Sequence, residues 1–255
     1  MEIATAETPF HAVVVTIFPE LIEAVASVGV FGRAVERGLV RLETINPRAY
    51  TEDRHQTVDS KAYGGGPGMV MKVGPLRAAL QEARRRCPEA KVIYLSPQGA
   101  PFVQQKAEAC AAQGQVILLA GRYEGIDQRL IDRDVDEQWS LGDYVLSGGE
   151  LPALVVLDAV ARLRPGVLGD EGSAEAESFS AGLLDFPHYT RPEEIDGQRV
   201  PEVLLSGDHG AIAAWRQAQA EAVTQRQRPD LWARWQEQQQ RAEKRNGGSG
   251  DGSHE

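Results

Sequence analysis

Three short apolar runs, each followed by a loop that contains glycine, constrain the fold of this 255-residue chain most strongly. The loops lie in Tyr94–Gly99, Ala120–Asp127 and Trp139–Pro152; in the last, the β-prone run 143–146 ends at Ser147-Gly148-Gly149 and Pro152 opens an apolar helix. Loops and helix N-termini that follow strands expose backbone N–H groups to polar ligands. The pattern predicts three strands whose loops form one pocket at one edge of a sheet, although a turn explains each glycine taken alone more simply.

Strands and helices alternate along the first two thirds of the chain, which predicts an α/β core with a mostly parallel sheet. Apolar runs predict strands at 12–18, 39–45, 91–95 and 116–120, and helical patterns predict helices at 19–29, 75–86, 102–112 and 152–163. Residues 186–245 have no convincing strand, and 210–226 and 230–245 are helical in character. We therefore expect a main domain at 11–168 and a small helical domain at 186–245. A flexible extension (1–10), an acidic interdomain linker (169–185) and a disordered tail (246–255) complete the predicted organisation.

Composition bounds the class of protein. The N-terminus lacks a basic stretch followed by an apolar one, and no apolar run reaches the roughly 18 residues of a membrane span, so we expect a cytoplasmic protein. Cys87 and Cys110 are isolated, which indicates reduced structural thiols. The net charge of −10 argues against a nucleic-acid partner, but residues 166–187 hold five acids and no base, so a basic surface elsewhere stays open.

The glycine loops do not match the common nucleotide or hydrolase motifs. The cluster Gly64–Gly68 lacks the Gly-Lys-Ser/Thr ending of a phosphate-binding loop, and neither a dinucleotide fingerprint nor a serine-hydrolase elbow is present. Tyrosines and leucines beside the turns, with Ile126, form a narrow cradle of backbone and apolar surface instead. Such a cradle suits a flat heterocycle with a ribose.

Several residue blocks between about Phe18 and Arg216 carry a family resemblance. They are Asp53–His55, Gly64–Met69, Tyr94–Gly99, Gly121–Asp127, Gly142–Pro152, Gly182–Asp185 and Pro187–Pro192. In this order and spacing they resemble the bacterial tRNA (guanine-N1)-methyltransferase family of the SPOUT superfamily. The resemblance implies an α/β domain with a deep trefoil knot, a small helical C-terminal domain and a homodimer. It implies methylation of N1 of guanosine 37 in tRNA, next to the anticodon and preferably after another guanosine.

The resemblance also implies which residues bind. The methyl donor, S-adenosylmethionine, would lie in the knot against Tyr94, Leu95, Ser96, Pro97, Gly121, Tyr123, Glu124, Gly125, Ser140, Leu141, Gly142, Tyr144, Leu146, Gly148, Gly149 and Pro152. The RNA would be contacted by Asp53, Arg54, His55, Asp59, His188, Arg191, Ser206, His209 and Arg216. Tyr189 and Trp215 are further candidates that equally suit a small-domain core. Glu124 resembles a family glutamate linked to Mg²⁺, although a lone carboxylate is a weak metal signal.

Two residues are implied in catalysis. Guanine N1 must lose a proton to become a nucleophile, so a carboxylate can serve as base and a cation can stabilise charge at O6. By family position the cation is Arg162 and the base is Glu177, where the family has aspartate; the side chain is one methylene longer, on the order of 1 Å. Glu175 is the alternative base, and a capping role is the alternative for Arg162.

Two other functions compete with the enzyme. One is an RNA-binding protein that keeps the fold without catalysis, for which the replaced aspartate gives a reason. The other is a phosphate-loop nucleotidase, which the missing Lys-Ser/Thr disfavours.

Overall fold

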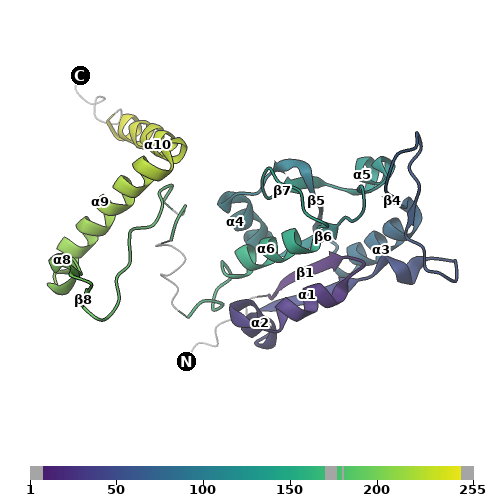
Figure 1. Ribbon diagram of the computed structural model, residues 1–255, viewed down its shortest axis with the longest axis horizontal. Coiled ribbons are helices and arrows are strands. Elements are labelled where there is room, and N and C mark those ends of the chain that lie inside the picture. Colours follow the sequence, from purple (N-terminus) through teal and green to yellow (C-terminus); the bar gives the residue numbers. More distant parts are fainter. Residues whose placement is uncertain (1–7, 170–176, 180, 248–255) are drawn as a thin grey trace, which may run out of the picture. The chain divides into compact units, whose positions relative to one another are not determined.

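The computed structural model describes residues 8–169, 177–179 and 181–247, and the chain forms two compact units, Met1–Glu171 and Gly172–Glu255 (Figure 1). The boundary falls within the predicted acidic linker. Within the described ranges, none of the helices has both the length and the apolarity needed to cross a membrane. Each unit is described separately below.

A parallel sheet of five strands forms the centre of the first unit. The strands are β1 (Phe10–Val15), β2 (Val40–Ile45), β5 (Lys91–Pro101), β6 (Gln115–Ala120) and β7 (Glu137–Ser140), in the order β2-β1-β6-β5-β7. Every neighbouring pair is parallel. β1 is buried along its whole length because helices cover both faces of the sheet, which explains its unbroken apolar character. The predicted parallel α/β core is confirmed.

Helices cover both faces of this sheet (Figure 1). On one face lie α1 (Pro19–Ala26), α2 (Gly29–Glu36), α4 (Gln104–Gln113) and α6 (Glu150–Ala161); on the other lie α3 (Val73–Arg86) and α5 (Gln128–Asp134). Alternate strand residues point to opposite faces. Ala12 and Val14 therefore pack with α6, whereas Val13 and Val15 pack with α3. A 3-10 turn (η1, Pro47–Tyr50) and the short strands β3 (Asp59–Ser60) and β4 (Val70–Met71) complete the unit.

The predicted strand at 143–146 is wrong. The strand before the last glycine loop is β7, which ends at Ser140, whereas Tyr144, Val145 and Leu146 lie exposed in the loop. The reason is burial: Trp139 is 5% exposed and stacks on Phe102 with ring centroids 5.3 Å apart, which anchors the preceding residues in the sheet. β-propensity alone does not reveal this packing.

Other boundaries differ from the sequence-based expectation. Phe10 is fully buried and begins β1, so it is not part of a flexible extension; residues 1–7 of that predicted extension lie outside the described residues. The expected helix 19–29 ends at Ala26, and Gly29, with φ of 68°, begins the unpredicted helix α2. β5 continues beyond Leu95 through a bulge to Pro101, so its glycine loop is an interruption within a strand.

The second unit is mainly helical. It contains α8 (Glu202–Leu205), α9 (His209–Gln227) and α10 (Pro229–Gly247), together with an unpredicted antiparallel pair, β8 (Glu194–Ile195) and β9 (Gln198–Arg199). The Asp208 carboxylate begins α9 by accepting hydrogen bonds from the N–H groups of Gly210 and Ala211. Residues 246 and 247 end α10, and the rest of the predicted tail lies outside the described residues.

The described end of the predicted linker packs on these helices. The Phe179 N–H donates to the Leu183 carbonyl at 2.7 Å, and the Leu184 N–H donates to Thr224 Oγ1 on α9 at 2.8 Å. Leu183 is buried. Residues 177–179 and 181–185 are therefore part of the second unit, and 170–176 lie outside the described residues.

Candidate active site

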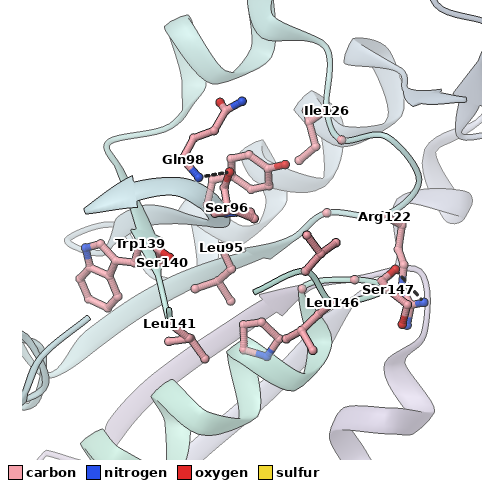
Figure 2. Close-up of a pocket in the computed structure, with 18 of the residues that line it drawn as sticks. Leu95, Ser96, Gln98, Arg122, Ile126, Trp139, Ser140, Leu141, Leu146 and Ser147 are labelled. Atoms are coloured by element: carbon pink, nitrogen blue, oxygen red, sulfur yellow. Dashed lines mark hydrogen bonds between the residues drawn. The ribbon is translucent and has the colours of Figure 1, made fainter. Parts of the chain in front are cut away.

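A cavity of about 470 Å³ opens beside β5, β6 and β7, where the three glycine loops converge (Figure 2). All of the residues predicted to hold the methyl donor line it. They are Tyr94, Leu95, Ser96, Pro97, Gly121, Tyr123, Glu124, Gly125, Ser140, Leu141, Gly142, Tyr144, Leu146, Gly148, Gly149 and Pro152. Their convergence is a property of the fold; donor binding by them stays a prediction.

Tyr94 forms the floor between the first two loops. Burial raises the pKa of its phenol above the ordinary value, because desolvation disfavours the phenolate. A Cβ at Gly121 would lie 2.8 Å from the Tyr94 ring, so glycine is needed there for the loop to pass over the aromatic face. In the first loop, the buried Ser96 Oγ accepts a hydrogen bond from the Gln98 N–H at 3.2 Å (Figure 2).

The third loop combines fixed backbone with exposed side chains. Buried Ser140 accepts the Gly142 N–H at 3.2 Å, and the Gly149 N–H donates to the Gly121 carbonyl at 2.9 Å. A Cβ at Gly149 would lie 2.6 Å from the Ala120 Cα, so α6 can begin against β6 only with glycine at this position. Because Tyr144 and Leu146 remain exposed, an apolar ligand surface stays accessible at the rim.

An ion pair between the partly buried Arg122 and the buried Glu150 lies beside the loops. The Arg122 Nε donates to Glu150 Oε2 at 2.8 Å, and the Thr16 hydroxyl donates to Glu150 Oε1 at 2.8 Å. Glu150 is 1% exposed, at the first turn of α6, where the helix dipole favours a carboxylate. Sequence reasoning missed this pair as functional residues. The available signal was an acidic residue directly after Gly148-Gly149, at the start of an otherwise apolar helix.

Comparison with known proteins shows the family of the chain. The family model for tRNA (guanine-1)-methyltransferase TrmD matches residues 10–234. The chain belongs to the tRNA (guanine-1)-methyltransferase family. It is 61% identical over 230 residues to the tRNA (guanine-N(1)-)-methyltransferase of Alcanivorax borkumensis, covering 89% of this chain and 87% of the relative. The protein of the same name from Halorhodospira halophila is 60% identical over 221 residues, covering 86% and 84%. The predicted family and enzyme class are confirmed.

The two residues expected in methyltransferase catalysis lie in different units. Arg162 is the half-buried C-cap of α6. At about 1.5 Å per residue it lies about 18 Å along the helix from Glu150, so within one chain α6 carries it away from the cavity rather than toward it. Glu177 is half-buried and lies in the second unit, next to a turn in which the Asp185 N–H donates to Ser178 Oγ. The alternative base, Glu175, lies outside the described residues.

The expected RNA-contacting residues also divide between the units. In the first, the Asp53 carboxylate accepts hydrogen bonds from Thr57, which lower the pKa of Asp53, and it also accepts the His55 N–H. This turn leaves Arg54 and His55 exposed, while Asp59 lies in β3.

In the second unit, His188, Tyr189, Arg191, Trp215 and Arg216 line another cavity. The Arg216 guanidinium carbon lies 4.9 Å from the centroid of the Phe186 ring, and the ring centroids of Tyr189 and Trp215 are 6.3 Å apart. Ser206 and His209 do not line that cavity; Ser206 accepts the Asp208 N–H and thereby shapes the start of α9.

The described residues do not fit a protein-built metal site. Among them there is no group of three or more His, Cys, Asp or Glu placed to hold an ion. Glu124 is exposed, and its side chain packs over Gly68, so one carboxylate is available there. Cys87 and Cys110 are free and buried, and burial raises their pKa values to about 11 and about 12, so both thiols are protonated at neutral pH; their structural role stays a prediction.

Proposed function

We propose that this enzyme transfers the methyl group of S-adenosylmethionine to N1 of guanosine 37 in tRNA. The observation that carries the proposal is the convergence of three glycine loops on one cavity in a chain of this family. Its volume lies in the roughly 300–1,000 Å³ range of small-molecule sites. The donor, when bound, supplies an electrophilic methyl group.

The cavity's residues fit such a donor by their chemistry. Gly121 lets the second loop pass over the Tyr94 ring, and Gly149 lets α6 begin against β6, at distances that any side chain would block. Leu95, Leu141 and Leu146 supply apolar surface. We propose that these loops belong to the deep trefoil knot of the SPOUT fold. In support, the chain builds β6 and β7 on opposite sides of β5 and then returns to bond Gly149 to Gly121.

In the proposed chemistry, Glu177 accepts the N1 proton of guanine and Arg162 neutralises the charge that develops at O6. Methyl transfer is an in-line displacement, so the remaining work of the site is to align N1 with the methyl carbon. No step is assigned to a metal ion, because the described residues do not build a site for one.

The distance of Arg162 from its own cavity supports a homodimer, in which Arg162 of one copy serves the cavity of the other. Helices α1 and α6 contact each other, and both leave apolar side chains exposed at helical spacing. These are Leu21, Val25 and Val28 on or just after α1, and Leu151 and Val155 on α6. A patch of this kind, repeated on two copies, suits a two-fold interface.

We propose that the second unit binds the anticodon arm through the cationic and aromatic residues around its cavity, notably Arg191, Trp215 and Arg216. The enzyme would act in the cytoplasm, where tRNA is processed. Within the second unit, the helical region 188–245 carries as many basic as acidic residues, so this part of the unit has no net formal charge to oppose RNA binding.

Methyl transfer from labelled S-adenosylmethionine to two tRNA transcripts tests the proposal. One carries guanosine and the other adenosine at position 37, with guanosine at 36 in both. We expect N1-methylguanosine from the first transcript only. Tight tRNA binding without turnover would instead indicate an RNA-binding protein, and ATP binding without donor binding would indicate a nucleotidase.

A further inference from the structure

We propose that the partly buried Arg122–Glu150 ion pair is a clasp that fixes the walls of the donor cavity, and that Arg122 is a positioning residue for the methyl donor. The inference rests on the proposed function, since it assumes that the donor binds in this cavity.

Arg122 joins two of the three loops. Besides its bond to Glu150, its Nη1 donates to the Ser147 carbonyl at 3.3 Å (Figure 2). Its backbone forms an antiparallel bridge with Gly148, and a Cβ at Gly148 would collide with the guanidinium. The side chain therefore fills the space that Gly148 leaves empty. Any movement of Arg122 has to displace both the second and the third loop.

Glu150 anchors this arrangement to the sheet. Its second oxygen accepts the Thr16 hydroxyl, and Thr16 Oγ1 in turn accepts the Phe18 N–H at 2.9 Å. The Phe18 ring lies 4.5 Å from the Arg122 guanidinium, so the arginine is held on a second side. Thr16 follows the end of β1, a fully buried inner strand of the sheet, so the network is attached to the core of the first unit.

The placement of the charges indicates a role at the cavity. The Arg122 side chain lines the cavity and is 19% exposed, whereas the Glu150 side chain is only 1% exposed and does not line the cavity. A buried pair contributes little net stability compared with apolar packing, but it enforces one geometry, because either charge left alone is costly. The loops that it holds contain glycine at 121, 125, 142, 148 and 149. Glycine allows the loop backbone many conformations, and the clasp restricts the loops to one of them.

Two conservative substitutions test the clasp. Arg122→Lys keeps the charge but loses the fork that reaches Glu150 and Ser147 together. Glu150→Gln keeps the shape and the acceptor for Thr16 but removes the negative charge. The matched control is Arg86→Lys, which alters an ion pair with Glu43 outside the cavity, with Nη1–Oε2 at 2.7 Å.

The measurements are S-adenosylmethionine binding by calorimetry, steady-state methyl transfer and thermal unfolding of the full chain. We expect each clasp variant to raise the donor Kd and donor KM about tenfold, the order of one charge-assisted hydrogen bond. The kcat at saturating donor and the KM for tRNA should change little, as should every constant of Arg86→Lys. The double variant should be no worse than the worse single one, because one interaction is lost in each case.

A merely structural role would lower the unfolding temperature and the active fraction, and hence kcat, while leaving the donor KM unchanged; that result overturns the clasp. If Arg122→Lys does not fold, Thr16→Val provides the test. This variant keeps both charges and removes the hydrogen bond from Thr16 to Glu150, so it should raise the donor Kd by a smaller factor. An unchanged Kd in Thr16→Val and Glu150→Gln also overturns it. If the wild-type chain binds no donor, the proposed function fails with it, and that failure is recognised before any variant is made.

Discussion

Replacing Gly149 with alanine should both destabilise the first unit and damage the donor cavity. The added Cβ would lie 2.6 Å from the Ala120 Cα and 2.9 Å from the Gly121 nitrogen, whereas ordinary contacts begin at 3.4 Å. Both neighbours are backbone atoms of β6 and its loop, so a flexible side chain cannot relieve the overlap. Gly149 has φ of −82°, which alanine adopts readily, so the effect is steric alone.

The size of the effect follows from the required movement of nearly 1 Å. Overpacking of this kind costs about 1–3 kcal/mol, which for a chain of this size lowers the unfolding temperature by about 2–12 °C. Because α6 and the Gly121 loop must separate, the cavity changes shape, and a 1 Å misplacement reduces kcat/KM on the order of 100-fold.

The assay compares Gly149→Ala with Gly74→Ala by calorimetric unfolding, donor binding and methyl transfer. Gly74 lies in α3 with no atom within 4 Å of an added Cβ apart from its chain neighbours, so alanine there meets no overlap like that at Gly149. The helix propensity gained by alanine and its contact with the ring of the following Pro75 oppose each other, so stability should change by less than about 1 kcal/mol. Equal donor affinity and stability for Gly149→Ala and the wild type would refute the packing argument. Lost stability with intact donor binding would refute the assignment of the cavity.

Three further predictions concern the catalytic residues and stability. Arg162→Ala should cut kcat far more than donor affinity, measured by single-turnover kinetics and calorimetry; equal losses would contradict a role in charge stabilisation. Glu177→Gln should abolish methyl transfer while Glu177→Asp retains or raises it, and an active Glu177→Gln enzyme would move the base elsewhere, with Glu175 first in line. Burial raises the pKa of Glu43, but hydrogen bonds with His11 and Arg86 and the charge of Arg41 outweigh it and hold that pKa below its ordinary value of 4.5. Its stabilisation is therefore complete above pH 4.5 and is lost as the pH falls through the folded-state pKa. In unfolding scans from pH 6 to 3, Glu43→Gln should show a shallower acid decline than the wild type, and exposed Glu89→Gln should not.

Much of the fold follows from local pattern. Strands β1 and β6 are buried on both faces of a parallel sheet, so nearly all of their residues are apolar and the strands can be recognised from composition alone. The amphipathic or apolar stretches of α3, α6, α9 and α10 are likewise recognisable within a few residues of their ends. The misplaced last strand differs, since it depends on the packing of Trp139 against Phe102, which a local window does not contain. Helix α2 is missed for another reason: Gly29, expected at the end of the preceding helix, is its first residue.

The family, the parallel core and the three glycine loops can be read from the amino-acid sequence, because they depend on residue type and local periodicity. How the loops are held depends on contacts between residues far apart in the chain. Arg122 and Glu150 are 28 positions apart, and Thr16 and Glu150 are 134 apart, yet they meet behind one cavity. The structure alone also distinguished Gly149, which allows close approach, from Gly29, which allows a positive φ. Hydrogen-bonded ion pairs and steric overlaps act only at short distance. The topology of the sheet determines which residues, far apart in the sequence, come within that distance.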